Sequence, residues 1–494
     1  MWLIPILLLG TILRFYNNTA IALWHDEAFS ALYIRYPFTE MMHRIALDVH
    51  PPLYYWILKL WTMVLGDSLL SLRGLSILLG VLTIWAGYLF VKQIFKNERL
   101  ALLAALLIAV NPFQVQYALE ARMYTLGTFL LLISSYLLLK ALETNSKKYW
   151  IWYGLTAAAC LYTHYFLFFS VAAQGLYALG ATLNFKQFFE NFKNSKFLRL
   201  MGSYLLALVL FLPWLPTFIV QNKRVEQSYW IPPMDRWSVP GTVWKMIFGG
   251  VGINHATLIA ATLASIVLIF YFLRKIKLAE KWLIFLLLVL PFIGSILLSL
   301  KTAIYLDRYF VFASLFLSII VAVSIMQATR FQMRRLLASI FVIVSLAVFF
   351  KNWQDLDVKN LFLSRQVNKK PGMAKAAEFI NERATPNDEI YVGSSFVFFT
   401  FKYYNQTGIK PLLYSSGKLS TIPHFSGTAL LNDGDLILDF KQAPADKTVW
   451  LLWTTGFGGS KPNVPGNWSI VSEQEAQDTP GFKGKIVVTQ YHVN

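Results

Sequence analysis

Residues 309–327 read YFVFASLFLSIIVAVSIMQ, a run without a single charged side chain. In helical form such a run is long enough to cross ~30 Å of hydrocarbon. Comparable apolar runs recur along the first 350 residues, at about 2–22, 69–91, 100–118, 124–142, 150–163, 165–183, 200–220, 256–273, 282–299 and 337–350. We therefore predict a mainly α-helical chain with about eleven membrane spans, of which 150–163 and 337–350 are the shortest.

Composition supports a polytopic membrane protein. Of the 494 residues, 56% are hydrophobic and only 14% are charged, and the mean hydropathy is +0.51. A soluble domain of this size is far more polar. The net charge of +18 does not indicate nucleic-acid binding, because the basic residues cluster in short loops between apolar runs. The single cysteine, Cys160, lies within an apolar run, which excludes a disulfide framework and a cysteine-based metal site.

The distribution of basic residues predicts the topology. Alternate loops carry Lys and Arg at residues 92–99, 147–148, 186–199, 274–281 and 330–335. The positive-inside rule makes these loops cytoplasmic. The first run lacks a basic n-region and a cleavage site before Arg14, so we interpret it as a retained span rather than a signal peptide. We expect a multi-pass protein of the plasma (inner) membrane, with a cytoplasmic N-terminus, an outer loop at 23–68 and an exported C-terminal segment.

Two domains are predicted, with a boundary at residue 350. Residues 1–350 form the transmembrane domain. From residue 351 onward the long apolar runs give way to polar residues and short alternating stretches. A helix is expected at 372–384 and strands at 389–392, 435–440, 448–453 and 485–490. Residues 351–494 are therefore predicted to be a small extracytoplasmic α/β domain.

The adjacent carboxylates Asp26 and Glu27 are the best candidates for chemistry. They follow the first apolar run and open a long outer loop, for which we predict amphipathic helices at the membrane interface. Ionisable groups at such positions are usually functional. The alternative is that the pair merely solvates a loop.

Several further segments follow in order: His50-Pro51-Pro52-Leu53-Tyr54-Tyr55, Gln116 to Tyr124 (QYALEARMY), Tyr162-Thr163-His164-Tyr165 and Asp307-Arg308-Tyr309. With Asp26-Glu27 they resemble a GT-C membrane glycosyltransferase. The nearest branch contains the protein O-mannosyltransferases and the bacterial aminoarabinose transferases, often called the dolichyl-phosphate-mannose-protein mannosyltransferase family. The resemblance covers about residues 1–350 and implies a GT-C helical bundle; it gives the C-terminal domain no role.

The resemblance implies transfer of a sugar, by default a hexose such as mannose, from a polyprenyl-phosphate donor. The acceptor, a protein, a lipid or a glycan, would be modified on the outer face with inversion at the anomeric carbon. Asp26 is similar in position to the family's general base, a role that suits a carboxylate near an acceptor hydroxyl. Glu27 would orient the acceptor or hold Asp26.

The donor phosphate requires cations, and Arg122 and Arg308 at outer span ends are the candidates. The other residues assigned to the donor site are His50, Tyr54, Tyr55, Glu120, Tyr124, His164 and Asp307. Related aminoarabinose enzymes carry Lys at the position of His50, so this side chain binds phosphate, binds a metal or packs.

Each of these assignments has a structural alternative. Glu120 with Arg122, and Asp307 with Arg308, are also compatible with local ion pairs. For His164, packing is favoured over ligation. Asp26, His50 and Glu120 are candidate ligands for a divalent metal ion, which His25 could join, but two histidines with scattered acids make a weak pattern. Metal use therefore stays open, and no other cofactor is indicated.

The outer loop at 221–255 combines Trp230, Arg236 and Trp237. These residues suit stacking on sugar rings as a lid over the site, or an interfacial aromatic belt. The alternative function is a polytopic transporter or flippase for a lipid-linked or anionic substrate. Such a protein would be expected to place ionisable groups near the bilayer midplane and to show paired repeats, which the sequence lacks.

Overall fold

The structure is a computed structural model that describes residues 2–16, 18–19, 22–183, 194–227, 230–250, 254–328, 330–354, 372–456, 459–477 and 484–494. The predicted basic residues at 186–193 and parts of the loop at 221–255 lie outside this range. The chain divides into two compact units, each of which is considered by itself. The membrane unit comprises Met1–Tyr16, Val49–Ile57 and Arg73–Phe350, and the C-terminal unit comprises Asn17–Asp48, Leu58–Leu72 and Lys351–Asn494.

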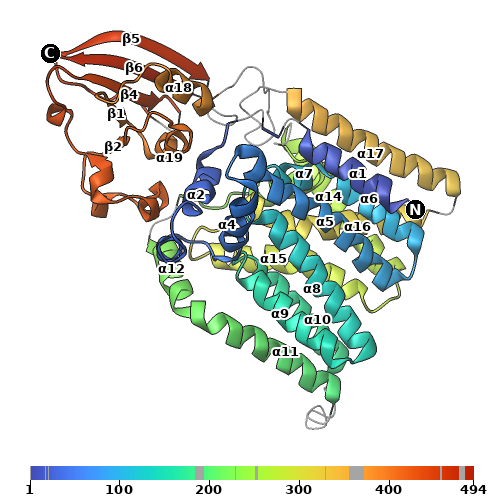
Figure 1. The fold of residues 1–494 in the computed structure, drawn as a ribbon. Helices are drawn as coiled ribbons and strands as arrows, with labels where there is room; N and C mark the ends of the chain where they lie inside the picture. Colours follow the sequence, from blue (N-terminus) through green and yellow to red (C-terminus); the bar gives the residue numbers. More distant parts are fainter. Residues whose placement is uncertain are drawn as a thin grey trace. The chain divides into compact units, whose positions relative to one another are not determined.

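The membrane unit is helical, as the apolar runs predict (Figure 1). Its helices are α1 (Leu3–Phe15), α5 (Leu69–Phe95), α6 (Glu98–Val110), α7 (Pro112–Ala118), α8 (Tyr124–Thr144), α9 (Lys147–Leu161), α10 (Leu167–Thr182), α11 (Ser195–Phe211), α12 (Leu215–Gln227), α13 (Ser238–Phe248), α14 (His255–Lys275), α15 (Lys281–Ser299), α16 (Val311–Met326) and α17 (Phe331–Gln354). Helix α4 (Leu53–Leu65) is divided between the two units.

Among the described residues, seven helical segments are long and apolar enough to cross a membrane, and α6 with α7 makes an eighth if this bent pair is one span. The protein is therefore an integral membrane protein, whereas the predicted count of about eleven spans stays a prediction. The predicted span at 100–118 bends by 59° between α6 and α7. Pro112 starts a new helix there, and the Asn111 side chain accepts the N–H of Gln114 at 3.0 Å.

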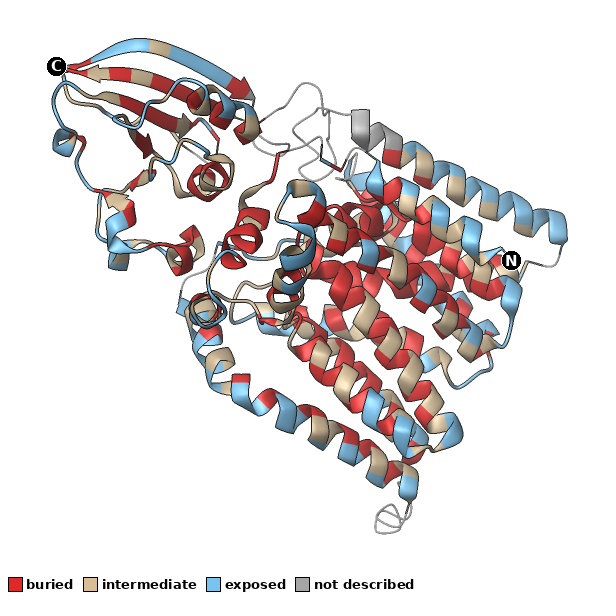
Figure 2. Ribbon diagram, viewed as in Figure 1, coloured by how far each residue is buried: buried red, intermediate tan, exposed pale blue. Residues whose placement is uncertain are grey.

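Burial separates central from peripheral helices in the membrane unit (Figure 2). In the segment Asp307–Met326, which contains α16, 83% of the apolar window is buried, against 6% for Phe331–Phe349 in α17. Polar side chains between helices are satisfied locally: Gln174 of α10 donates to the hydroxyls of Ser134 and Ser135 of α8 at 2.7 and 2.8 Å. The exposed apolar faces of the peripheral helices are those expected to contact lipid.

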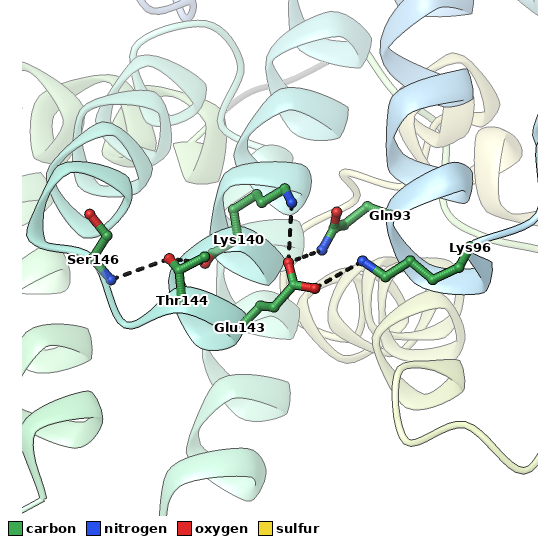
Figure 3. A network of polar contacts seen from close by, with 6 residues as sticks. All are labelled: Gln93, Lys96, Lys140, Glu143, Thr144 and Ser146. Carbon is green, nitrogen blue, oxygen red and sulfur yellow. Dashed lines mark hydrogen bonds and ion pairs between the residues drawn. The ribbon is translucent and has the colours of Figure 1, made fainter.

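Helix ends on the predicted cytoplasmic side are joined by an exposed polar network (Figure 3). The Glu143 carboxylate at the end of α8 accepts from Lys96, Lys140 and Gln93 at 2.9, 3.1 and 2.7 Å. Because these groups are solvent-exposed, each contact contributes little to stability. The network contains none of the predicted site residues, so Glu143 is a suitable position for a control substitution.

The C-terminal unit is built on one mixed sheet, as predicted for an α/β domain (Figure 1). Its elements are α2 (His25–Tyr33), α3 (Phe38–Leu47), α18 (Gly372–Asn381), β1 (Glu389–Val392), α19 (Ser395–Tyr404), β2 (Leu412–Tyr414), β3 (Leu436–Ile437), β4 (Thr448–Thr454), β5 (Trp468–Gln477) and β6 (Lys485–Val493). The strand order is β3-β2-β1-β4-β6-β5. The first four strands are parallel, and β6 runs antiparallel to both β4 and β5.

Three features of this sheet differ from the sequence prediction, of which the first is that strand β2 was not predicted. The strand expected at 435–440 is limited to Leu436–Ile437, because the Asp439 side chain accepts the N–H of Lys441 at 2.9 Å and turns the chain. Strand β5 was not predicted; its polar sequence suits an edge strand. On this strand Glu473 accepts from Lys461 at 2.9 Å, and this hydrogen bond and one from Thr489 lower the pKa of the Glu473 carboxyl.

Candidate functional site

The predicted acidic pair lies in the first turn of α2, in the C-terminal unit. Asp26 is half-buried, whereas Glu27 is fully buried. The Glu27 carboxylate accepts the backbone N–H of Trp24 at 3.4 Å and so caps its own helix. The positive end of the helix dipole favours both negative charges. This geometry suits Glu27 as a support and leaves Asp26 the more accessible acid.

Helix α2 packs on helix α19 of the same unit. The ring of His25 lies 5.4 Å from that of Phe396 and 5.8 Å from that of Phe399, and Phe29 lies 5.0 Å from Phe399. Just before α2, the N–H of Leu23 donates to the Tyr404 hydroxyl at 2.8 Å. The acidic pair is therefore positioned by residues almost 400 positions later in the chain, which no local pattern indicates.

The predicted outer loop belongs to the C-terminal unit except for Val49–Ile57, which belongs to the membrane unit. Arg44 of α3 donates to the carbonyl of Ala429 at 3.2 Å and to the side chain of Asn432 at 3.3 Å. Lys59 of α4 donates to the carbonyls of Ile34 and Tyr36 at 2.8 and 2.7 Å. The predicted helices of residues 23–68 are present as α2, α3 and α4, and Arg44 and Lys59 are supporting residues that sequence reasoning missed.

In the membrane unit, a cationic cluster forms around Arg122. This side chain is buried, donates to the Tyr55 hydroxyl at 3.3 Å and approaches Nε2 of His50 at 3.2 Å. Because a guanidinium only donates, His50 Nε2 accepts and its ring proton resides on Nδ1. Next to Arg122, Ser76 donates to the carbonyl of Arg122 at 3.3 Å and hydrogen-bonds Tyr54 at 3.0 Å.

His164 lies in the turn between α9 and α10, and its ring is buried against Tyr309 and Phe312 at 4.9 and 5.3 Å. The N–H of Phe166 donates to its Nδ1 at 3.1 Å, so Nε2 carries the proton of the neutral ring. Among the described residues this buried Nε2 has no hydrogen-bond partner. Burial holds the pKa of His164 well below its usual range, and the positive charges of Arg122 and Arg308 act in the same direction. His164 thus packs, as favoured from sequence, and also presents a neutral donor.

The remaining predicted residues lie close to this cluster. The buried Tyr124 ring is 5.9 Å from that of His164, and the carbonyl of buried Glu120 accepts the Arg122 N–H at 2.7 Å. Buried Arg308 places its guanidinium 5.3 Å from the centre of the Trp230 ring. The structure therefore brings the predicted donor residues of the membrane unit together.

Asp307 has a different partner from the one considered in the sequence. Its carboxylate forms an ion pair with Lys245 of α13 and accepts the backbone N–H of Arg308 at 2.7 Å. Lys245 was not selected from the sequence, because it lies in α13, 62 positions from Asp307. For the metal ion, no group of three or more His, Cys, Asp or Glu side chains in the described part of the chain is arranged to hold one.

Comparison with solved structures defines the class of this fold. The chain is similar to ArnT from Cupriavidus metallidurans bound to undecaprenyl phosphate, with a TM-score of 0.64 and 12% identity over 99% of this chain and 98% of that one. The apo form of the same protein gives a TM-score of 0.62 with 11% identity, over 99% and 97% of the two chains. A weaker likeness, with a TM-score of 0.35, 20% identity and coverage of 44% and 34%, is to the Saccharomyces cerevisiae Pmt1–Pmt2 complex bound to the sugar donor.

Sequence comparison finds a family match over part of the chain. Residues 49–216 match the family described as dolichyl-phosphate-mannose-protein mannosyltransferase. An uncharacterised protein of Aquifex aeolicus is 31% identical over 109 residues, which span 22% of each chain. The partial family match and the shared fold agree with the predicted resemblance to GT-C membrane glycosyltransferases. The matched segment contains His50, Tyr55, Arg122 and His164 of the cluster.

Proposed function

We propose that this protein transfers a sugar from a polyprenyl-phosphate donor to an acceptor hydroxyl at the outer face of the membrane. The observation that carries the proposal is the buried cluster of Arg122, His50, Tyr55 and His164 inside an apolar helical unit. Arginine and neutral N–H and O–H donors in a low-dielectric site are well suited to a phosphate group. Similarity to a protein whose structure contains undecaprenyl phosphate supports this donor class.

The proposed reaction is a single displacement at the anomeric carbon. The acceptor oxygen forms a bond to this carbon as the bond to the phosphate oxygen breaks, which inverts the configuration. Asp26 takes the proton of the acceptor hydroxyl, a task suited to a half-buried carboxylate. Arg122 and Arg308 stabilise the charge that develops on the leaving phosphate. Glu27, buried and capping α2, holds Asp26 in position.

The family match supports the proposed sugar, and the basic loops support the proposed location. The family description names mannose, so a hexose such as mannose is the proposed sugar, and the acceptor is a protein, a lipid or a glycan. The basic loops support a cytoplasmic N-terminus in the plasma membrane and an outer site. No step of the proposed reaction uses a divalent metal ion.

Substitution of Asp26 tests the proposal. Purified Asp26→Asn protein should lose about 10²- to 10⁴-fold in transfer from undecaprenyl-phosphate mannose, because general base catalysis contributes that much. Asp26→Glu should retain part of the activity, and Glu143→Gln, in the remote network, should match the wild type. Wild-type transfer by Asp26→Asn would remove the assigned base. Flipping of the lipid across vesicles without any sugar transfer by the wild type would instead favour a transporter.

A further inference from the structure

A pocket of about 660 Å³ lies in the membrane unit, and Asp307, the chain neighbour of Arg308, lines it. It is bounded by residues 232–235 and 237–238, by one face of α13, by the start of α14 and by the segment Tyr305–Asp307. Its volume falls in the ordinary range of small-molecule sites, which is about 300–1,000 Å³. None of the residues that the family resemblance assigned to the donor site lines it, except Asp307.

The charge of the lining argues against an anionic ligand. The charged lining residues are Lys245, Asp307 and Asp235, which sum to one net negative charge when His255 is neutral. Lys245 and Asp307 form an ion pair and are each about four-fifths buried, with side-chain exposures of 18% and 21%. A paired ammonium and carboxylate present donors and acceptors side by side. Such a pair suits neutral hydroxyl groups better than a phosphate.

The pocket also has aromatic faces held in fixed orientations. The Trp237 indole is half-buried and stacks on the His255 ring, with centroids 3.9 Å apart and planes 6° apart, and the Arg236 guanidinium lies 5.5 Å from the centre of the indole. The buried Tyr305 hydroxyl hydrogen-bonds Thr242 at 2.9 Å. An aromatic face is electron-rich and attracts the weakly positive C–H groups of a pyranose ring. The remaining lining is largely apolar, as in most sites that bind a small molecule.

The position of the pocket links it to the proposed phosphate site. Asp307 and Arg308 are adjacent in one 3-10 turn (Asp307–Phe310), where the Asp307 carboxylate accepts the Arg308 N–H at 2.7 Å. This turn contributes Asp307 to the pocket and the Arg308 guanidinium to the cationic group near His164. In a polyprenyl-phosphate sugar the pyranose is joined directly to the phosphate, so adjacent sites for the two parts are required.

We infer that this pocket is a saccharide subsite that binds one neutral pyranose ring. Lys245 and Asp307 hydrogen-bond its hydroxyl groups, and Trp237 packs on its C–H face. The inference rests on the proposed glycosyltransferase function and adds a location for the sugar. The ring is either the sugar of the donor or a sugar unit of a glycan acceptor; the recognition chemistry is the same for both.

Binding of simple hexosides tests the subsite without turnover. Saturation-transfer NMR on the full-length protein in detergent would use methyl α-D-mannopyranoside and methyl α-D-glucopyranoside as probes. Wild-type protein should bind at least one, and Lys245→Met and Trp237→Ala should weaken binding about tenfold, as expected for loss of one charged hydrogen bond or one stacking face. Trp237→Phe, which keeps an aromatic face, should retain most of the affinity, and Glu143→Gln should equal the wild type.

Three results would overturn the subsite: no binding of either hexoside by wild-type protein, unchanged binding in both pocket variants, or a loss in the controls Trp237→Phe and Glu143→Gln as large as that in the pocket variants. Displacement of the bound hexoside by undecaprenyl-phosphate mannose assigns the pocket to the donor sugar, and retention assigns it to an acceptor glycan. Asp26→Asn should bind hexosides like the wild type. If wild-type protein binds no hexoside but Asp26→Asn abolishes transfer, only the subsite is rejected. If Asp26→Asn transfers sugar normally, only the assignment of Asp26 as the base is rejected.

Discussion

Replacement of Phe399 by alanine tests whether the packing of α19 against α2 supports catalysis. Its effect on kcat should be distinguishable from its effect on the stability of the C-terminal unit. The Phe399 side chain is fully buried, and its ring lies 5.0 Å from Phe29 and 5.8 Å from His25 of α2. Removing a buried phenylalanine ring typically costs about 3–5 kcal/mol. Part of this loss falls on the contact that holds the helix of Asp26, so the helix should shift relative to its support.

The assay is steady-state transfer from undecaprenyl-phosphate mannose. A displacement of about 1 Å at a catalytic group costs up to about 10²-fold in rate, so kcat of Phe399→Ala should fall about 10- to 100-fold. The donor KM should change little, because Arg122 and His50 lie in the membrane unit. Thermal unfolding of the C-terminal unit, followed in parallel, gives the stability loss.

Phe440→Ala is the matched control, since it makes the same chemical change in the sheet core. The Phe440 ring is 2% exposed and stacks on Tyr391 and Tyr414 at 5.8 and 4.3 Å. Phe440→Ala should lower the stability of the C-terminal unit about as much as Phe399→Ala does. The folded fraction of Phe440→Ala should keep the wild-type kcat. Equal loss of kcat in both variants, or wild-type kcat in Phe399→Ala, would refute the positioning role of α19.

Other expected outcomes concern charge, packing and pH. Arg122→Lys should raise the donor KM by about tenfold or more, because lysine cannot reproduce two directed guanidinium contacts; steady-state kinetics check this. Gly294→Ala places a methyl group against the Phe169 ring and should lower the detergent melting temperature through overpacking worth about 1–3 kcal/mol, whereas Gly202→Ala, with no atom within 4 Å, should not. The folded pKa of Glu473 lies below its usual 4.5, so its contribution is present above pH 4.5 and is lost as pH falls through the lowered value; Glu473→Gln should flatten that part of the stability profile in melts at graded pH.

The helices were predictable because each apolar run must satisfy its backbone groups internally in lipid. The positions at which these helices end or break were harder to predict. The segment 100–118 is apolar throughout, yet Pro112 divides it. In the C-terminal unit, β1 and β4 followed from buried apolar stretches, whereas the polar edge strand β5 has no comparable signal. Hydrophobic periodicity reports burial, and an edge strand is buried too little to show it.

The candidate site was predicted by residue type and resemblance, but not by arrangement. Arg122 and His50 are 72 positions apart, and Lys245 is 62 positions from Asp307. Such pairings depend on how helices pack, which no local spacing encodes. The same limit explains why the acidic pair was placed with the membrane domain, while its visible supports, Phe399 and Tyr404, lie in the C-terminal domain.

The hydrogen bond between Leu23 and Tyr404 joins residues 381 positions apart, which has a consequence for biosynthesis. At ~5–20 residues per second, a ribosome needs roughly 20–80 s to travel between these two residues. Throughout that interval the nascent chain inserts its membrane helices while α2 lacks the surface on which it rests. The proposed base is therefore seated only after the membrane helices have been made, and partially synthesised chains should be catalytically silent.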